Sequence, residues 1–174
     1  MVNIREMTDA DIEAVAAIRV SGWRHAYAGL VPRHHLDAMD ATANAAAHRA
    51  RLAGGDDRSV NAVAEEAGSV VGWACYGPCR DAGRPPGTGE LYAIYVLPEL
   101  IGTGVGRALW TAALGGARQH GYARLVLWVL RGNAHARRFY ERAGCTRDGA
   151  ERTDEVGGAA VPEVRYVLEP LRTP

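Results

Sequence analysis

The chain contains no lysine, because all twenty of its basic residues are arginine. Without lysine it lacks the Gly-Lys-Ser/Thr end of a nucleotide-triphosphate loop, so hydrolysis of ATP or GTP is not expected. We attribute the bias to genome composition, and an arginine is therefore weaker evidence for a phosphate contact than usual. Twenty acidic residues cancel the basic ones, and no block of like charge stands out. The charge pattern gives no reason to expect nucleic acid or a membrane as a partner.

Cysteine is also scarce. Cys75, Cys79 and Cys145 are odd in number and show no Cys-x-x-Cys spacing, which favours reduced thiols over disulfides or a zinc site. Long apolar runs are missing as well: we find neither a membrane-spanning stretch nor a basic-then-apolar leader. These absences predict a cytoplasmic protein without a metal.

The apolar patterns predict a single domain of mixed α/β type, with an antiparallel first half, a strand–helix–strand crossover and a terminal hairpin. Expected strands are 2–7, 60–64, 69–76, 91–97, 125–130, 145–151 and 161–168; expected helices begin at the capping box 8–11 and cover about 42–52, 104–120 and 133–143. The run 91–97 is almost wholly apolar, which indicates a strand buried on both faces. Residues 77–89, rich in Gly and Pro, are interpreted as an exposed loop and a candidate mobile lid.

The most informative segment is 96–107. An apolar strand there breaks at Pro98 into three alternating glycines, Gly102, Gly104 and Gly106, and then into a helix rich in alanine and leucine. Glycine lets the backbone approach a ligand, and the first amides of a helix have no intrahelical acceptor. Such amides can bind a phosphate group. The segment therefore predicts a site for a phosphorylated ligand.

The spacing of the glycines excludes the dinucleotide-binding fingerprint. Gly-x-Gly-x-x-Gly fails because its sixth position is Arg107 when counted from Gly102 and Leu109 when counted from Gly104. The strand 125–130 also lacks the acidic residue that binds a ribose hydroxyl in that fold. A flavin or nicotinamide oxidoreductase is therefore disfavoured.

Two ordered motifs resemble the GNAT superfamily of N-acetyltransferases. Residues 101–106 are similar to the family's acetyl-CoA loop, Gln/Arg-x-x-Gly-x-Gly/Ala, with Ile101 in place of the usual Gln or Arg. Asn133, Tyr140 and Gly144 then match the element Asn-x6-Tyr-x3-Gly-Phe, with cysteine in the last position. The resemblance is strongest over 90–145.

The resemblance implies one N-acetyltransferase domain over 1–174 with the GNAT fold. In that fold a mostly antiparallel, mixed sheet of about seven strands is flanked by helices. The strands 91–97 and 125–130 would form its parallel, splayed pair.

The resemblance also implies acetyl-CoA as the cosubstrate. The coenzyme A diphosphate would lie on the amides of the glycine loop, helped by the helix dipole. The pantetheine arm would pair with the strand 91–97. Pro98 would end this strand and help the two parallel strands to splay apart, and Asn133 would either bond the arm or cap a helix. At Ile101 we expect a weakened or rearranged phosphate contact rather than lost binding. The implied cofactor-binding residues are Ile94, Tyr95, Val96, Gly102, Thr103, Gly104, Val105, Gly106, Arg107 and Asn133.

Acetyl transfer to an amine needs a neutral amine, a stabilised oxyanion and a proton for the departing thiolate. The resemblance assigns the oxyanion to a backbone amide near Val96 and the proton to Tyr140. The alternative for Tyr140 is simple packing beside Phe139.

The base is less well defined. Glu90 is the first candidate, acting directly or through water, and His25 and His135 come behind it; a solvated surface carboxylate is the alternative reading of Glu90. Relatives that acetylate protein N-termini often carry a glutamate where this chain has Trp128. That departure argues against an acceptor of the ribosomal-protein type.

Aromatic residues suggest where the acceptor would bind. Trp23, Tyr27, Tyr92 and Trp128 could line a pocket for a cationic or amphipathic amine, with core packing as the alternative. The expected function is direct acetyl transfer to a primary amine, of a small molecule first of all. An acetyl-CoA sensor without turnover and an enzyme acting on a protein or peptide amine stay open, as does a homodimer paired through the terminal hairpin.

Overall fold

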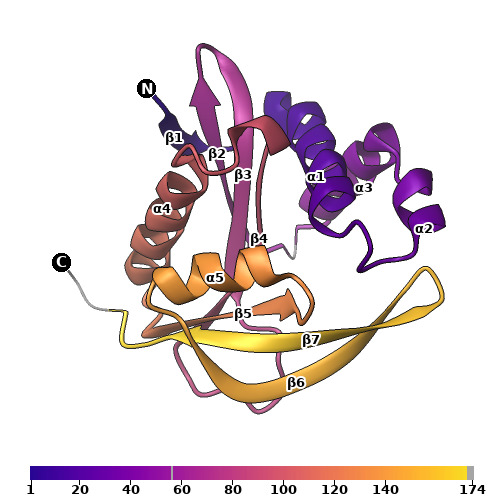
Figure 1. The fold of residues 1–174 in the computed structure, drawn as a ribbon. Coiled ribbons are helices and arrows are strands. Elements are labelled where there is room, and N and C mark those ends of the chain that lie inside the picture. The colour runs from indigo at the N-terminus through magenta and orange to yellow at the C-terminus, as the bar shows by residue number, and fades with distance from the viewer. Residues whose placement is uncertain (56, 172–174) are drawn as a thin grey trace.

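The computed structural model describes residues 1–55 and 57–171, which form a seven-stranded mixed sheet with helices on both faces (Figure 1). The strand order is β1-β2-β3-β4-β5-β7-β6, and only the β4–β5 pair is parallel. The strands are β1 (Asn3–Glu6), β2 (Val60–Glu66), β3 (Ser69–Pro78), β4 (Thr88–Val96), β5 (Arg124–Leu130), β6 (Thr146–Val156) and β7 (Ala159–Leu168). The helices are α1 (Ile12–Ala26), α2 (Arg33–Ala38), α3 (Ala41–Ala53), α4 (Val105–Gln119) and α5 (Ala134–Arg142), with short 3-10 turns at Asp9–Asp11 and Pro98–Leu100. The predicted fold class is confirmed.

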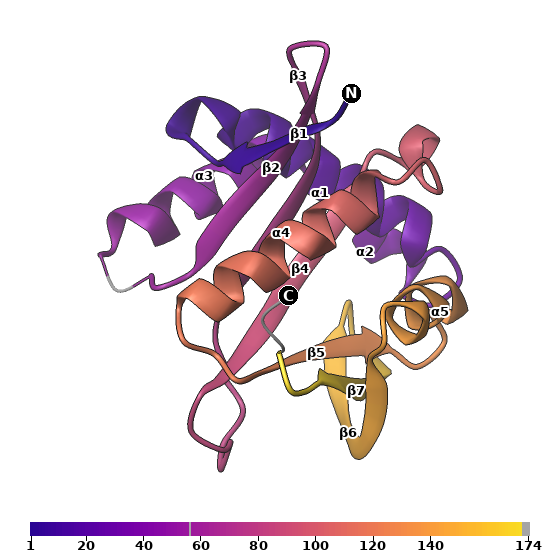
Figure 2. The ribbon, with the colours of Figure 1, turned by 90° about the vertical axis from the view of Figure 1, so that its left-hand side faces the viewer.

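The two faces of the sheet carry different helices, as Figures 1 and 2 show. Strand alternation sends Val63 and Trp73 to the face where Val15 of α1 packs. Their neighbours Ala64 and Ala74 contact α4 on the opposite face. Small alanines therefore let α4 lie close to the sheet, while the larger residues fill the space under α1. None of the described helices has the length and apolarity that a membrane span requires.

The predicted loop over 77–89 is too long at both ends. β3 continues to Pro78 and β4 begins at Thr88, and the Cys79 amide donates to the Thr88 carbonyl at 3.2 Å. Cys79 and Thr88 are both buried. The Gly and Pro residues of this segment hide the strand ends from sequence analysis. Pairing with the neighbouring strand, rather than local propensity, determines where these strands end.

The parallel pair separates soon after it forms. β4 pairs with β5 only through Thr88–Arg124, Gly89–Leu125 and Glu90–Val126, and β5 continues alongside β7. The expectation that 91–97 is buried on both faces is therefore corrected: β4 is buried up to Leu91 and half-buried from Tyr92 to Val96. The separation begins well before Pro98, so that proline is not its cause.

A β-bulge coincides with the separation. Cys75 and Tyr76 are consecutive on β3 but face Ala93 and Leu91 on β4, which leaves Tyr92 as the extra residue. Bulges bend a strand and increase its twist. The bulge thus lies at the point where β4 diverges from β5.

The β6–β7 hairpin reaches back to the N-terminal helices (Figure 1). Val156 and Val161, near its tip, belong to an apolar cluster with Val31 and Leu36 of the α2 region. The hairpin therefore closes one side of the opening between β4 and β5 with residues of the same chain. Pairing of this hairpin across a dimer remains a prediction.

Candidate active site

The glycine loop turns sharply between β4 and α4. Gly102 and Gly104 have φ of 87° and 103°, a region that favours glycine, and Gly104 precedes the first residue of α4. The Thr103 amide and hydroxyl both donate to the Leu100 carbonyl, at 3.2 and 2.7 Å. Thr103 was predicted to offer its amide to a ligand, but that amide is already engaged within the turn.

The remaining amides of the loop are free to bind a ligand. Within the described chain, the amides of Gly102, Gly104, Val105, Gly106 and Arg107 donate to no backbone carbonyl. α4 is fifteen residues long, so its dipole adds a positive potential at the same place. Arg107 and Ile101 are exposed beside this loop, the latter at 38%. An anion could therefore be held here mainly by backbone.

The open edge of β4 faces the same region. The Leu97 amide donates to the Val71 carbonyl of β3 at 3.0 Å, and successive residues of a strand point their amides to opposite sides. The amides of Val96 and Ile94 therefore face the side that β5 has left. Tyr95, predicted among the backbone contacts of the cosubstrate, directs its backbone to β3 instead.

Asn133 and Tyr140 lie at opposite ends of α5. The Asn133 carboxamide oxygen accepts from the Ala136 amide at 3.1 Å, which is the capping alternative of the prediction. Tyr140 packs edge to face against Trp110 and Phe139, with ring centroids 5.6 and 5.1 Å away. The side chains of Asn133 and Tyr140 are both buried, with exposed fractions of 9% and 6%.

The packing contacts of Tyr140 are made by its ring and do not involve its hydroxyl. It makes no hydrogen bond to any residue that the structure describes. Burial raises the pKa of Tyr140 well above its ordinary value, and the nearby Tyr95 hydroxyl and Cys145 thiol raise that pKa further. The phenol is therefore a neutral donor at physiological pH. The packing and the proton-donor interpretations of Tyr140 are compatible.

A cavity of about 140 Å³ opens on the α1 face, between β4, β5 and the β6–β7 hairpin. Glu90, the first candidate for the base, lines it together with the four residues predicted for the acceptor wall, Trp23, Tyr27, Tyr92 and Trp128. Tyr95, predicted to bind the cosubstrate, also lines this cavity, and the prediction missed four charged residues of the lining: Arg80, Arg152, Asp154 and Glu163. His25 and His135 are exposed and do not line it.

Tyr92 and Tyr95 both line this cavity although three positions separate them. In a regular strand that spacing would place them on opposite faces. The bulge at Tyr92 restores them to one face. Tyr95 then reaches α1, where its ring would lie 2.8 Å from a Cβ at Gly22. Its hydroxyl is 3.1 Å from that of Tyr27, so Gly22 permits the contact that closes this wall.

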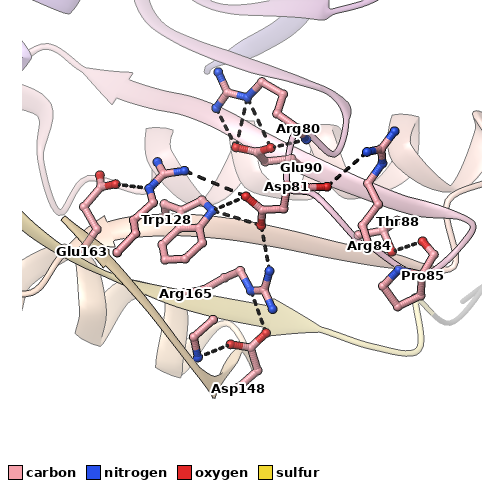
Figure 3. A network of polar contacts seen from close by, with 12 residues as sticks. Arg80, Asp81, Arg84, Pro85, Thr88, Glu90, Trp128, Asp148, Glu163 and Arg165 are labelled. Carbon is pink, nitrogen blue, oxygen red and sulfur yellow. Dashed lines mark hydrogen bonds and ion pairs between the residues drawn. The ribbon is translucent and has the colours of Figure 1, made fainter. Parts of the chain in front are cut away.

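Glu90 is a buried carboxylate, 1% exposed, so the surface interpretation is corrected. Its Oε2 accepts from the Arg80 amide at 2.9 Å, and its Oε1 accepts from the Arg80 guanidinium at 2.6 Å (Figure 3). The Arg80 guanidinium also lies 4.2 Å from the centre of the Tyr92 ring. Arg80 thus neutralises and orients the one carboxylate beside the end of the parallel pairing.

Arginine side chains lie over two rings of the predicted acceptor wall. Arg152 lies 4.2 Å from the centre of the Trp128 ring, as Arg80 does over Tyr92. The Trp128 indole N–H donates to Asp81 at 3.1 Å, and Asp81 also accepts from Arg165 at 2.7 Å (Figure 3). Arginines therefore already lie over these two rings, and the use of the wall by a cationic acceptor remains a prediction. The carboxylate of Asp81, just after Arg80 in the loop, ties that loop to β5 and β7.

Among the described residues, no group of three or more His, Cys, Asp or Glu side chains is arranged to hold a metal ion. Burial raises the pKa of the thiols of Cys75 and Cys145 to about 11 and about 12. All three cysteines are buried and unpaired. They have the character of packing residues.

Comparison with known proteins identifies the family. The family model "Acetyltransferase (GNAT) family" matches residues 22–145. The uncharacterized N-acetyltransferase YuaI of Bacillus subtilis is 33% identical over 164 residues, which cover 94% of this chain and 91% of that protein. Among solved structures, a ribosomal-protein-alanine N-acetyltransferase from Brucella melitensis superposes with a TM-score of 0.74 at 25% identity, covering 96% of this chain and 99% of that one.

The PaiA N-acetyltransferase of Thermoplasma acidophilum, solved in complex with coenzyme A, has the same fold, with a TM-score of 0.71 at 17% identity and coverage of 94% and 98%. The fold, the family model and the curated relatives agree. The chain therefore belongs to the GNAT family of acetyltransferases and is an N-acetyltransferase.

Proposed function

We propose that this enzyme transfers the acetyl group of acetyl-CoA to a primary amine of a small molecule, by direct attack within a ternary complex. One observation carries the proposal: β4 leaves β5 after Glu90, so that the opening has free backbone amides on one side and a polar, aromatic cavity on the other. Two substrates could therefore meet at the β4 edge. The coenzyme A complex of the Thermoplasma acidophilum neighbour supports the choice of cosubstrate.

The coenzyme A diphosphate would lie on the free amides of Gly102, Gly104 and 105–107. The pantetheine arm would bond the open backbone edge at Ile94 and Val96, in the manner of an added strand. The Val96 amide, which faces that edge, would donate to the developing oxyanion. Asn133 would contribute by fixing the start of α5, since its carboxamide oxygen accepts from the Ala136 amide.

Gly104→Ala and Gly106→Ala form a matched pair that tests this cradle. Alanine at position 104 meets open space but must adopt a φ near 103°, which costs about 1–2 kcal/mol. Alanine at position 106 finds its nearest neighbours at an ordinary 3.7 Å and keeps a helical backbone. We expect Gly104→Ala to raise the dissociation constant of coenzyme A about tenfold, and Gly106→Ala to change it less than about twofold. An unchanged dissociation constant for Gly104→Ala in calorimetry would exclude the loop as the diphosphate site.

Tyr140 would donate a proton, or a hydrogen bond, to the departing thiolate. We expect Tyr140→Phe to lower kcat about 100-fold while the KM for acetyl-CoA stays within about twofold, since the ring keeps its packing against Trp110. Tyr76→Phe is the control, because Tyr76 is equally buried but its hydroxyl contacts His120. Unchanged turnover of Tyr140→Phe with an unchanged melting temperature leaves packing as its role.

Glu90 would accept the proton of the attacking amine, directly or through water, by means of the lone pairs that Arg80 does not use. We expect Glu90→Gln to lower kcat/KM at neutral pH about 100-fold and to shift the pH optimum upward, because free amine is then needed. The control is Glu163→Gln, which removes a second carboxylate from the same cavity, one bonded to Arg152 at 2.5 Å. A pH–rate profile of Glu90→Gln that coincides with the wild type contradicts the assignment.

The function itself is tested by a screen for release of coenzyme A from acetyl-CoA in the presence of small amines and of peptides with free N-termini. We expect release with small amines, and a mass increase of one acetyl group on the amine. Turnover of peptides alone would make the enzyme a protein acetyltransferase. Binding of acetyl-CoA without release by any amine would identify an acetyl-CoA sensor.

A further inference from the structure

A second and larger cavity, of about 530 Å³, lies beside the first one, between α1, α3, β3 and β4. The two cavities share Trp23, Arg80, Tyr92 and Tyr95, so these four side chains form the wall between them. The first cavity is smaller than the usual volume of a metabolite site, which is roughly 300–1,000 Å³. It can hold the reacting end of an acceptor but not the body of one. The second cavity has room for that body.

The lining of the second cavity is strongly basic. Its described residues include five arginines, at positions 19, 51, 58, 80 and 84, and the carboxylate of Asp57. Asp57 pairs with Arg51 at 3.0 Å and Glu90 pairs with Arg80 at 2.6 Å, so Arg19, Arg58 and Arg84 carry the excess positive charge. Arg19 donates to the Asn44 carboxamide at 2.8 Å, and Arg84 donates to the Asp81 carbonyl at 3.1 Å. These two arginines are thus oriented by neutral oxygens. Their positive charge remains uncompensated at those contacts.

His48 provides an independent indication of a ligand. This residue of α3 is only 8% exposed and lines the same cavity, yet its Nε2 has no hydrogen-bond partner among the described residues. A buried polar atom without a partner is costly unless something else satisfies it. The ring lies 5.8 Å from that of Trp73, which fixes its plane. His48 thus adds a buried polar group with unmet hydrogen-bonding capacity to the lining of this cavity.

Resting on the proposed function, we infer that the acceptor is an amine that also carries an anionic group, either a carboxylate or a phosphate. The anion is held by Arg19 and its neighbours in the second cavity, beside His48. The amine extends past the wall of Trp23, Arg80, Tyr92 and Tyr95 to the first cavity, where Glu90 and the β4 edge lie. Bidentate guanidinium contacts recognise both kinds of anion.

The test compares amines that differ by one anionic group. Hexylamine is paired with ε-aminocaproate, and aminohexanol with its phosphate ester, so that the amine and the anion are far enough apart to reach both cavities, and kcat/KM is measured by release of coenzyme A. We expect the wild type to favour an anionic member by about tenfold or more, and which pair responds tells carboxylate from phosphate. Arg19→Gln should reduce that preference about tenfold, through KM and not kcat. Arg49→Gln is the control, because Arg49 pairs with Glu13 on the exposed side of α3 and lines neither cavity.

Equal rates for both members of each pair, or an equal effect of Arg19→Gln on neutral and anionic amines, would overturn the inference. Failure of the proposed function is separable from this result. If no amine releases coenzyme A, binding of aminohexanol phosphate and ε-aminocaproate is followed through the fluorescence of Trp23 and Trp73, which line the cavity. Binding that Arg19→Gln weakens would assign the cavity to an anionic ligand that is not an acceptor. Absence of binding to the wild type would refute the anion site altogether.

Discussion

The site depends on one constraint, the loss of hydrogen bonding between β4 and β5 after three paired residues. Exposed strand edges are normally paired or covered, because their amides and carbonyls would otherwise lack partners. Here β5 leaves to follow β7, and the edge at Ile94 and Val96 stays open in the middle of the sheet. An extended arm with amides of its own is the kind of ligand that satisfies such an edge. The glycine loop lies at the end of this open edge.

β4 can diverge from β5 and still remain part of the sheet because its opposite edge is paired with β3. It remains paired to β3 up to Val96, while the bulge at Tyr92 bends it away from β5. The opening on the α1 face is then closed by the β6–β7 hairpin, whose residues Val156 and Val161 pack with Val31 and Leu36. Ion pairs from Asp81 and Glu163 to Arg165 and Arg152 fasten the same hairpin around Trp128. The acceptor region is thus built by segments from both ends of the chain.

The sequence predicted the strands, the glycine loop and α5 because each has a local signal, either periodicity or Gly and Pro punctuation. The side of a strand to which a residue points was harder to predict from the sequence. The pairing of Tyr95 with β3, and its place beside Tyr92, depend on the bulge, which no local pattern announces. Arg152 and Glu163 come together because they are register partners across the β6–β7 hairpin. In the sequence they cannot be told from the charged residues of any exposed hairpin.

Under the proposed function, Arg80 would link recognition of the acceptor to the chemistry. It belongs to the wall between the two cavities, and it holds the buried carboxylate of Glu90 with both its amide and its guanidinium. Removal of its side chain would leave Glu90 buried without its counter-charge, so such a variant would lose stability and geometry together. Arg19 lies on the far side of Trp23 and has no contact with Glu90, its guanidinium being held by Asn44. Anion recognition can therefore be separated from the chemistry at Arg19, whereas at Arg80 the two are one interaction.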